Sequence, residues 1–212
     1  MGVSRDSYHV LSFRGMNFIQ TQRCTLVPVI YPRSLDGFSF QDSKLLNPNR
    51  QPDMVDMSDG YIKDFYNALR DESTSKACNF NNRDETAIKS WAAKKTEQSA
   101  YLWAVMKSEN EEVIGFVCAK PLDIDATQRV FFISGGGNEN YRNKGYGKEI
   151  LSSFMPFLKT NLGTTGIKTS AFNWNTASLK LQQSAGFKVT SLNGKPINSN
   201  PEDVCIEFEF HF

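Results

Sequence analysis

The residues best suited to chemistry form one short segment, Tyr141-Arg142-Asn143-Lys144-Gly145-Tyr146-Gly147-Lys148. It stands between a predicted strand and a predicted helix. Glycine lets the backbone approach an anion without a Cβ in the way, and the free N–H groups at a helix start point at the ligand with the positive end of the helix dipole behind them. Arg142, Lys144 and Lys148 add positive charge for a pyrophosphate. The segment therefore predicts a phosphate-binding turn, although a basic turn that merely contains glycines is the plainer alternative.

Two other phosphate-binding motifs fit this sequence less well. A Walker P-loop needs Ser or Thr after Gly-Lys and a glycine six positions before that lysine, but Glu149 and Arg142 occupy those positions. The dinucleotide fingerprint Gly-x-Gly-x-x-Gly fails because Asn140 stands where the third glycine belongs. A nucleotide-binding domain of either kind is therefore disfavoured.

Apolar periodicity predicts the elements that must position this turn, in the order β, α, α, β, β, β, α, β, α, β, β. A stretch rich in Pro, Asn, Asp and Ser, residues 34–59, is expected to be a loop. The order indicates an α/β (α+β) fold with a mixed sheet and helices on both faces. Strands are predicted at residues 18–31, 101–108, 112–122, 129–134, 166–172, 187–192 and 204–212, and helices at 59–71, 83–98, 149–162 and 176–185.

Proline and glycine predict local irregularities in three places, and a polar segment predicts a turn in a fourth. Pro28 should place a bulge or the end of pairing in the first strand. A regular strand is improbable at residues 135–137, where three consecutive glycines favour a bulge or a splayed edge. Pro156 should kink or break its helix. A polar turn at residues 109–112 should join two strands as a hairpin.

Length and composition bound the class of protein. The 212 residues suit one sizeable domain, taken as residues 17–212 after an N-terminal extension at 1–16. A net charge of +1 gives no field that would argue for nucleic acid or an anionic membrane. The four cysteines show no metal-ligand spacing and are expected to be buried free thiols, with no metal bound. The chain shows neither a membrane-span pattern nor a secretory signal, so we expect a cytoplasmic protein.

Several motifs, in order along the chain, resemble one enzyme family. Arg142, Gly145 and Gly147 match the acetyl-CoA loop Arg/Gln-x-x-Gly-x-Gly/Ala of the GNAT acetyltransferases. The stretch Asn175-Thr176-Ala177-Ser178, followed by Gly186-Phe187, is similar to a signature of their RimJ/RimL-like branch. Residues 19–29 resemble the first strand of that branch, and residues 101–117 resemble its central hairpin.

The resemblance implies a GNAT fold, whose mixed, mostly antiparallel central sheet is splayed after the fourth strand. It also implies that acetyl-CoA is the cosubstrate, with its pantetheine arm in the gap of the sheet. The backbone from Ile133 to Gly137 would bond the pantetheine amides like an added strand. The implied cofactor-binding residues are Ile133, Gly135, Gly137, Arg142, Asn143, Lys144, Gly145, Tyr146, Gly147, Lys148, Asn175 and Ser178.

Acyl transfer from a thioester to an amine needs a proton for the leaving thiolate and a neutral amine. By the same resemblance Ser178 is the candidate that hydrogen-bonds the CoA sulfur, and its alternative is a residue that only begins a helix. Gln182 stands where the RimI-like branch has its acid tyrosine. Glu139 is the candidate general base, acting on the amine through a water, or else a solvated loop carboxylate. Glu207 and Glu209 are expected on the solvated face of an edge strand.

The leading hypothesis is an N-acetyltransferase that acts by direct transfer in a ternary complex, without a nucleophilic cysteine. Its acceptor is a primary amine of a protein N-terminus, a lysine or a small molecule such as a polyamine or aminoglycoside. A non-catalytic acyl-CoA-binding regulatory module of the same fold is the alternative. The sequence leaves the acceptor and the oligomeric state open.

Overall fold

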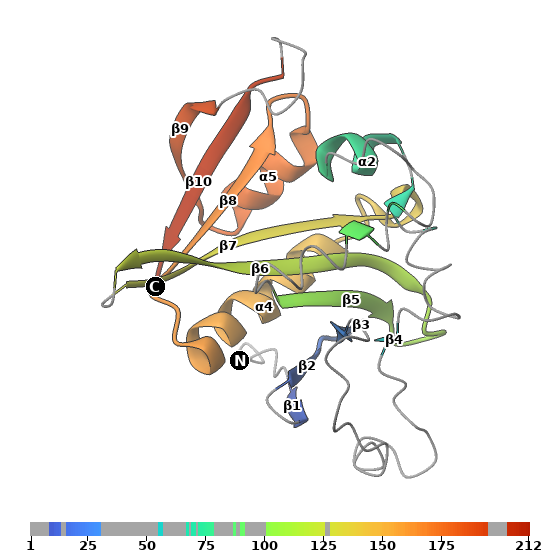
Figure 1. Cartoon of the computed structure of the whole chain (residues 1–212). Coiled ribbons are helices and arrows are strands. Elements are labelled where there is room, and N and C mark those ends of the chain that lie inside the picture. The colour runs from blue at the N-terminus through green and yellow to red at the C-terminus, as the bar shows by residue number, and fades with distance from the viewer. Residues whose placement is uncertain are drawn as a thin grey trace, which may run out of the picture.

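The computed structural model describes residues 9–13, 16–30, 55–56, 67, 69–70, 72–78, 87, 90–91, 101–125, 128–194 and 203–212. These residues form a ten-stranded sheet with helices packed against it (Figure 1). The strands are β1 (His9–Phe13), β2 (Met16–Gln20), β3 (Cys24–Ile30), β4 (Val55–Asp56), β5 (Tyr101–Lys107), β6 (Val113–Asp125), β7 (Gln128–Gly137), β8 (Gly166–Phe172), β9 (Lys188–Gly194) and β10 (Cys205–His211). The helices are α2 (Glu72–Cys78), the short η3 (Glu139–Tyr141), α4 (Tyr146–Leu162) and α5 (Thr176–Ser184).

The sheet is mixed and mostly antiparallel, as predicted. Its strand order is β1-β2-β3-β5-β6-β7-β8-β10-β9, and β4 pairs with β3 outside this path. The β7–β8 and β3–β4 pairs are parallel, and the remaining pairs are antiparallel. A parallel pair needs a crossover, which α4 supplies between β7 and β8.

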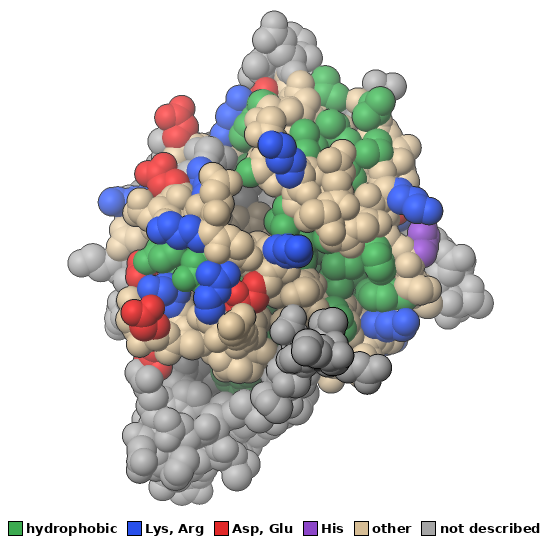
Figure 2. Space-filling view, turned by 180° about the vertical axis from the view of Figure 1, so that it is seen from behind, with side chains coloured by type: hydrophobic (Ala, Val, Ile, Leu, Met, Phe, Trp, Pro, Cys, Tyr) green, Lys and Arg blue, Asp and Glu red, His purple; other side chains and the backbone are tan. Residues whose placement is uncertain are grey.

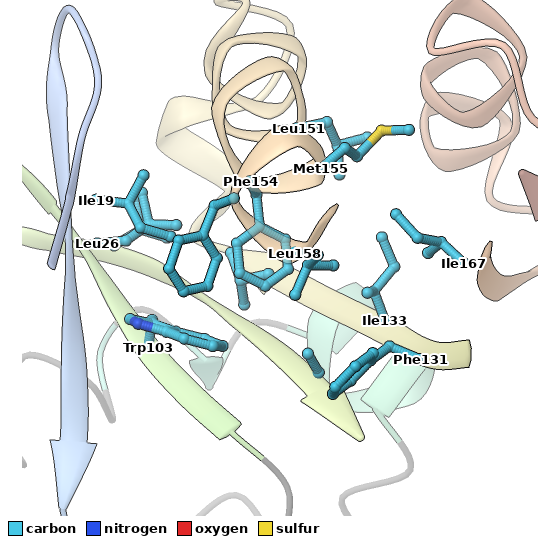
Figure 3. Packing of buried hydrophobic residues seen from close by; sticks show 14 of the residues in the cluster. Ile19, Leu26, Trp103, Phe131, Ile133, Leu151, Phe154, Met155, Leu158 and Ile167 are labelled. Atoms are coloured by element: carbon cyan, nitrogen blue, oxygen red, sulfur yellow. The ribbon is translucent and has the colours of Figure 1, made fainter. Parts of the chain in front are cut away.

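The core lies between the sheet and α4. The Trp103 ring packs edge-on against Phe154 and Phe157 of α4, with centroid distances of 5.1 and 5.8 Å. Figure 3 shows Trp103 and Phe154 beside Ile19 and Leu26 at one end of the cluster, with Ile133 and Ile167 at the other. α4 thus joins strands from both halves of the sheet.

The opposite face of the sheet is also covered. Side chains alternate along a strand, so Phe116 points away from the face that carries its buried neighbour Val117 in the α4 core. Phe116 packs against Trp91, which lies in a helical segment, with a centroid distance of 4.9 Å. Helices on both faces are therefore confirmed.

The predicted splay lies between β7 and β8. Their pairing covers only Val130–Phe132 of β7 against Gly166–Lys168 of β8, whereas β7 continues to Gly137 in register with β6. Figure 1 shows the two strands diverging, with α2 near their far ends. Contacts tie α2 to both halves: the Thr74 hydroxyl donates to the Gly137 carbonyl over 3.1 Å, and Lys76 Nζ lies 3.4 Å from Asp203 Oδ1 ahead of β10.

The expectation of an irregular strand at residues 135–137 is wrong on the β6 side. The three glycines pair in register with Gly115, Phe116 and Val117. A Cβ on Gly115 would lie closer than 3.0 Å to the Gly136 carbonyl, so the two backbones approach each other closely here. The glycines therefore permit close pairing, and only the β8 side of the strand is splayed.

The expectation of one strand over residues 18–31 is also wrong. The chain reverses at residues 21–23, and β2 and β3 form an antiparallel hairpin with Ile19 opposite Leu26. Thr21 closes the turn, because its N–H donates to Cys24 O over 2.8 Å and its hydroxyl oxygen accepts from Cys24 N over 3.0 Å. Pairing of β3 with β5 ends at Pro28, as predicted.

Three further differences concern helices and edges. α4 continues through Pro156, so of the kink or break expected there, the break is absent. β10 lies between β8 and β9 and is not an edge strand, and Glu209 is bound to Lys168 across the β8–β10 pair over 2.5 Å. α2 and β1 were not predicted. The helices predicted at 59–71 and 83–98, and the loop at 34–59, lie largely outside the described residues.

Candidate functional site

The basic turn has the backbone geometry that an anion site needs. Asn143 and Gly145 both have positive φ, 59° and 84°, and Gly145 is the N-cap of α4. Among the described residues, no side chain caps this helix. The first helical hydrogen bond runs from Glu149 N to Gly145 O over 3.1 Å. The N–H groups of the helix's first turn therefore lack intrahelical partners and point toward the turn.

The second glycine of the turn has a packing role. A Cβ on Gly147 would lie 3.0 Å from Leu181 Cδ2. Gly147 therefore lets α5 approach the start of α4. α5, whose start carries the Asn175-to-Ser178 segment, therefore packs through Leu181 against the first turn of α4.

Backbone groups of β7 line the splay. Asn138 N donates to Ile114 O over 2.9 Å, while Gly137 is opposite Gly115, so Gly137 occupies a position that does not bond to β6. By alternation, the N–H and C=O groups of Ile133, Gly135 and Gly137 all face away from β6, toward the diverging β8. These are the three β7 residues proposed from the sequence. At the far end, Gly137 O already accepts from Thr74.

Arg142 points its guanidinium toward the end of β7 and α2. Its Nη2 donates to Thr74 Oγ1 over 2.8 Å and to Gly137 O over 3.2 Å. Its backbone N–H donates to Glu139 O over 3.1 Å. Arg142 was expected at the pyrophosphate; in the structure, its side chain connects the turn to the end of β7 and to α2.

Arg23, which was not among the residues expected at the site, places its guanidinium against the basic turn. Arg23 Nη1 donates to Lys144 O over 3.1 Å, and its Cζ lies 4.1 Å from the centroid of the Tyr146 ring. Arg23 Nε also donates to Glu149 Oε2 over 2.7 Å. The only available signal was that Thr21 and Arg23 fall in the segment 19–29, which resembles the family's first strand.

The carboxylate of Glu149 is fully engaged by the β2–β3 turn. Its Oε1 accepts from Thr21 Oγ1 over 2.5 Å and from Arg23 N over 2.7 Å. Burial acts to raise the pKa of Glu149, but the hydrogen bonds from Thr21 and Arg23 outweigh it and lower the pKa below its ordinary value. Glu149 is thus held ionised and paired beside the turn.

The cysteine near the basic turn is not suited to act as a nucleophile. Burial and the nearby Glu149 raise the pKa of the Cys24 thiol to about 12, so it is protonated at neutral pH. Cys24, Cys118 and Cys205 are buried free thiols, as predicted, and Cys78 has no described side chain. No cluster of metal-ligating side chains occurs among the described residues.

Tyr141 holds the start of the basic segment against the β5–β6 hairpin. Its hydroxyl donates a short hydrogen bond to Glu112 Oε2. This bond, with burial and the charge of Glu112, raises the pKa of Tyr141 to about 12. The ring packs edge-on against Tyr146, with a centroid distance of 5.9 Å.

The catalytic candidates lie at two places. Asn175 Oδ1 accepts from Ser178 N over 3.1 Å, which caps α5. Ser178 is half-buried, and Gln182 lies one turn further on the same helical face with only 7% of its surface exposed. Glu139 lies in η3, two residues past the end of β7, and is exposed. The structure therefore joins Asn175 to Ser178 directly, and it places Glu139 at the opposite side of the splay.

Charge is mixed on the face of the protein seen in Figure 2. In Figure 2, Lys and Arg side chains are interspersed with Asp and Glu and form no continuous basic face. This agrees with the net charge of +1. Within the described ranges, no helix is long and apolar enough to span a bilayer.

A protein-family model described as the acetyltransferase (GNAT) domain matches residues 54–188. Among curated proteins, the chain is similar to the SPbeta prophage-derived uncharacterized N-acetyltransferase YokL of Bacillus subtilis (strain 168), with 23% identity over 105 residues. That match covers 50% of this chain and 58% of the relative, so the chain spans little more than half the length of that relative.

Two solved structures show the same fold. A GNAT-family acetyltransferase from Bacillus anthracis has a TM-score of 0.64 at 14% identity, covering 92% of this chain and 98% of the other. A spermidine N-acetyltransferase from Vibrio cholerae, solved in complex with CoA and spermine, has a TM-score of 0.60 at 13% identity, covering 73% of this chain and 91% of the other.

Proposed function

Because this chain belongs to the acetyltransferase (GNAT) family, we propose that it transfers the acetyl group of acetyl-CoA to a primary amine. One observation carries the proposal: α4 begins behind a left-handed Gly145 with no side-chain cap among the described residues, and it follows β7, which continues to Gly137 beyond its pairing with β8. An uncapped helix start favours an anion. A strand with one unpaired side favours an extended chain.

Acetyl-CoA has a polyanionic end and an extended amide-containing arm, and the site offers a matching surface for each. Its pyrophosphate lies at the first-turn N–H groups of α4, with Lys144 and Lys148 supplying charge. Its pantetheine arm follows β7 in the splay, where Ile133 and Gly135 present backbone donors and acceptors. Lys144 and Lys148 are both exposed, which allows them to reach a bound ligand.

The reaction is a direct displacement in a ternary complex. The neutral amine attacks the thioester carbonyl, a C–N bond forms and the C–S bond breaks. The amine loses one proton and the departing CoA thiolate gains one, so the products are an amide and CoA. No cysteine nucleophile is needed, which agrees with the protonated, buried state of Cys24.

Ser178 donates a hydrogen bond to the departing sulfur in this proposal. The Asn175 cap fixes the first turn of α5 and hence the direction of the Ser178 side chain. Gln182, one turn further on, has an Oε1 atom that is buried without a hydrogen-bond partner. Glu139, exposed at the end of β7, accepts the amine proton through a water molecule.

The acceptor is a small-molecule amine, a lysine or a protein N-terminus. The Vibrio cholerae structure of similar fold, named for spermidine and solved with spermine, makes polyamines the first acceptors to assay.

A panel of amines tests the proposal, with thiol release from acetyl-CoA as the readout. The panel holds spermidine, spermine, an aminoglycoside, lysine-containing peptides and peptides with a free N-terminus. Thiol release that depends on one amine class, with the amide product seen by mass spectrometry, is expected. Binding of acetyl-CoA without turnover of any amine would instead favour the non-catalytic acyl-CoA-binding module, and absence of binding would refute both.

A further inference from the structure

Glu149 places a negative charge close to the proposed phosphate-binding turn. It lies in the first turn of α4, where a carboxylate stabilises the helix but repels an anionic ligand. Three hydrogen bonds from the β2–β3 turn occupy its two oxygens, at 2.5, 2.7 and 2.7 Å. Two of these donors belong to Arg23, so the negative charge is offset by a guanidinium that the same contacts hold in place.

The same guanidinium holds the backbone of the basic turn. Arg23 Nη1 donates to Lys144 O, and Arg23 Nη2 is the atom nearest to the place of a Cβ on Gly145, at 3.4 Å. In a trans peptide the C=O and the following N–H point in opposite directions. A Lys144 carbonyl anchored by Arg23 therefore directs the Gly145 N–H away from Arg23.

We propose that Arg23 is a positioning residue of the donor site, which holds the turn in its phosphate-binding form and offsets the charge of Glu149. The inference rests on the proposed use of acetyl-CoA. Arg23 acts from the β2–β3 turn, 126 residues from Glu149 in sequence, and connects the first hairpin of the sheet to the cofactor turn. Its effect is confined to the part of the donor that carries phosphate.

Two acyl donors, one with a pyrophosphate and one without, distinguish this role from a general contribution of Arg23 to folding. Acetyl-CoA carries the pyrophosphate, and S-acetyl-pantetheine lacks it. Arg23→Ala should raise the Kd of CoA and the KM of acetyl-CoA about 10- to 100-fold, the size expected for lost charge-assisted hydrogen bonds. The kcat at saturating acetyl-CoA should stay within about twofold, and kcat/KM for S-acetyl-pantetheine within about threefold, because neither depends on the phosphate turn.

Arg129→Ala is the matched control. Arg129 Nη1 donates to Leu162 O over 2.9 Å, which is the same kind of contact at the other end of α4. Loss of this contact should leave the KM of acetyl-CoA and the kcat/KM for S-acetyl-pantetheine unchanged. If Arg23→Ala does not fold, Arg23→Lys keeps the charge but lacks the fork that reaches Glu149 and Lys144 O together, and the same donor-selective rise in KM is expected.

An equal fall in kcat/KM for acetyl-CoA and S-acetyl-pantetheine, or an unchanged KM for acetyl-CoA, would overturn the role of Arg23 while leaving the proposed function intact. A wild-type protein that neither binds CoA by calorimetry nor uses either donor with the amine panel would overturn the proposed function, and the role of Arg23 with it.

Discussion

Arg142 Nη2 donates to Thr74 Oγ1 over 2.8 Å, which ties the basic turn to α2 across the end of β7. Thr74 is buried, and its hydroxyl in turn donates to Gly137 O over 3.1 Å. The turn, the last residue of β7 and α2 thus meet at one hydroxyl group. This places α2, which the sequence did not predict, against the splay.

Thr74→Val should lower the free energy of unfolding by about 1–3 kcal/mol, the usual net worth of the two hydrogen bonds that the hydroxyl makes. The change keeps the shape of the side chain and replaces the hydroxyl with a methyl group. Urea unfolding measures it. Thr190→Val, at an exposed position of β9, is the control and should change stability by less than about 0.5 kcal/mol. Equal effects of the two substitutions would show that the Thr74 contacts carry no stability.

Gly115→Ala should destabilise the protein by about 1–3 kcal/mol, because the new Cβ would force β6 and β7 apart at the Gly136 carbonyl. Gly135→Ala should cost less, since its Cβ would meet the Phe116 carbonyl at 3.0 Å, a distance that a small shift relieves. Urea unfolding of both variants gives the comparison. A neutral Gly115→Ala would mean that the close pairing of the glycine segment is not required.

Tyr141→Phe should be less stable than wild type at neutral pH, and this difference in unfolding free energy should disappear in strong alkali. The hydrogen bond to Glu112, with burial and the charge of Glu112, raises the pKa of Tyr141 in the folded protein to about 12, above the value of about 10 for a free phenol. A raised folded pKa means that the contribution is fully present below pH of about 10 and is lost between about 10 and 12. The difference in unfolding free energy between wild type and Tyr141→Phe, followed over this range, should shrink as pH rises.

Ser178→Ala should lower kcat about 10- to 1,000-fold while acetyl-CoA affinity changes little, because a hydrogen bond to the leaving sulfur is strongest in the transition state. Single-turnover acetylation at saturating donor, with the amine found in the panel, measures the chemical step. Ser184→Ala is the control: Ser184 is exposed in the same helix and donates to Leu181 O over 2.9 Å. An unchanged rate for Ser178→Ala would leave Ser178 as a helix-start residue only.

Elements with strong periodicity could be predicted from the sequence. Residues 166–172 were predicted as a strand and form β8 with those bounds, because β-branched and apolar side chains alternate between turn residues. The helix predicted from residue 149 begins three residues earlier, at Tyr146, because Gly145 supplies the left-handed N-cap. In both places local chemistry and tertiary structure agree.

The missed features depend on contacts between distant residues. The reversal at residues 21–23 contains no glycine, proline or asparagine, and its stability comes from Glu149, far along the chain. α2, with the sequence ESTSKAC, lacks an apolar stripe and is held instead by Thr74 and Lys76. The periodicity of apolar residues does not predict contacts between residues so far apart in the chain. The role of Arg23 was missed for the same reason.

The most direct test of the account is a calorimetric titration of acetyl-CoA into wild type, Gly145→Val and Gly163→Val. Both glycines have positive φ, 84° and 65°, at the two ends of α4, so both substitutions should cost roughly the same stability, about 1–2 kcal/mol. Only Gly145 belongs to the phosphate turn. We expect wild type and Gly163→Val to bind acetyl-CoA with similar Kd and folded Gly145→Val to show no measurable binding. A folded Gly145→Val protein that binds acetyl-CoA as tightly as wild type would contradict this expectation.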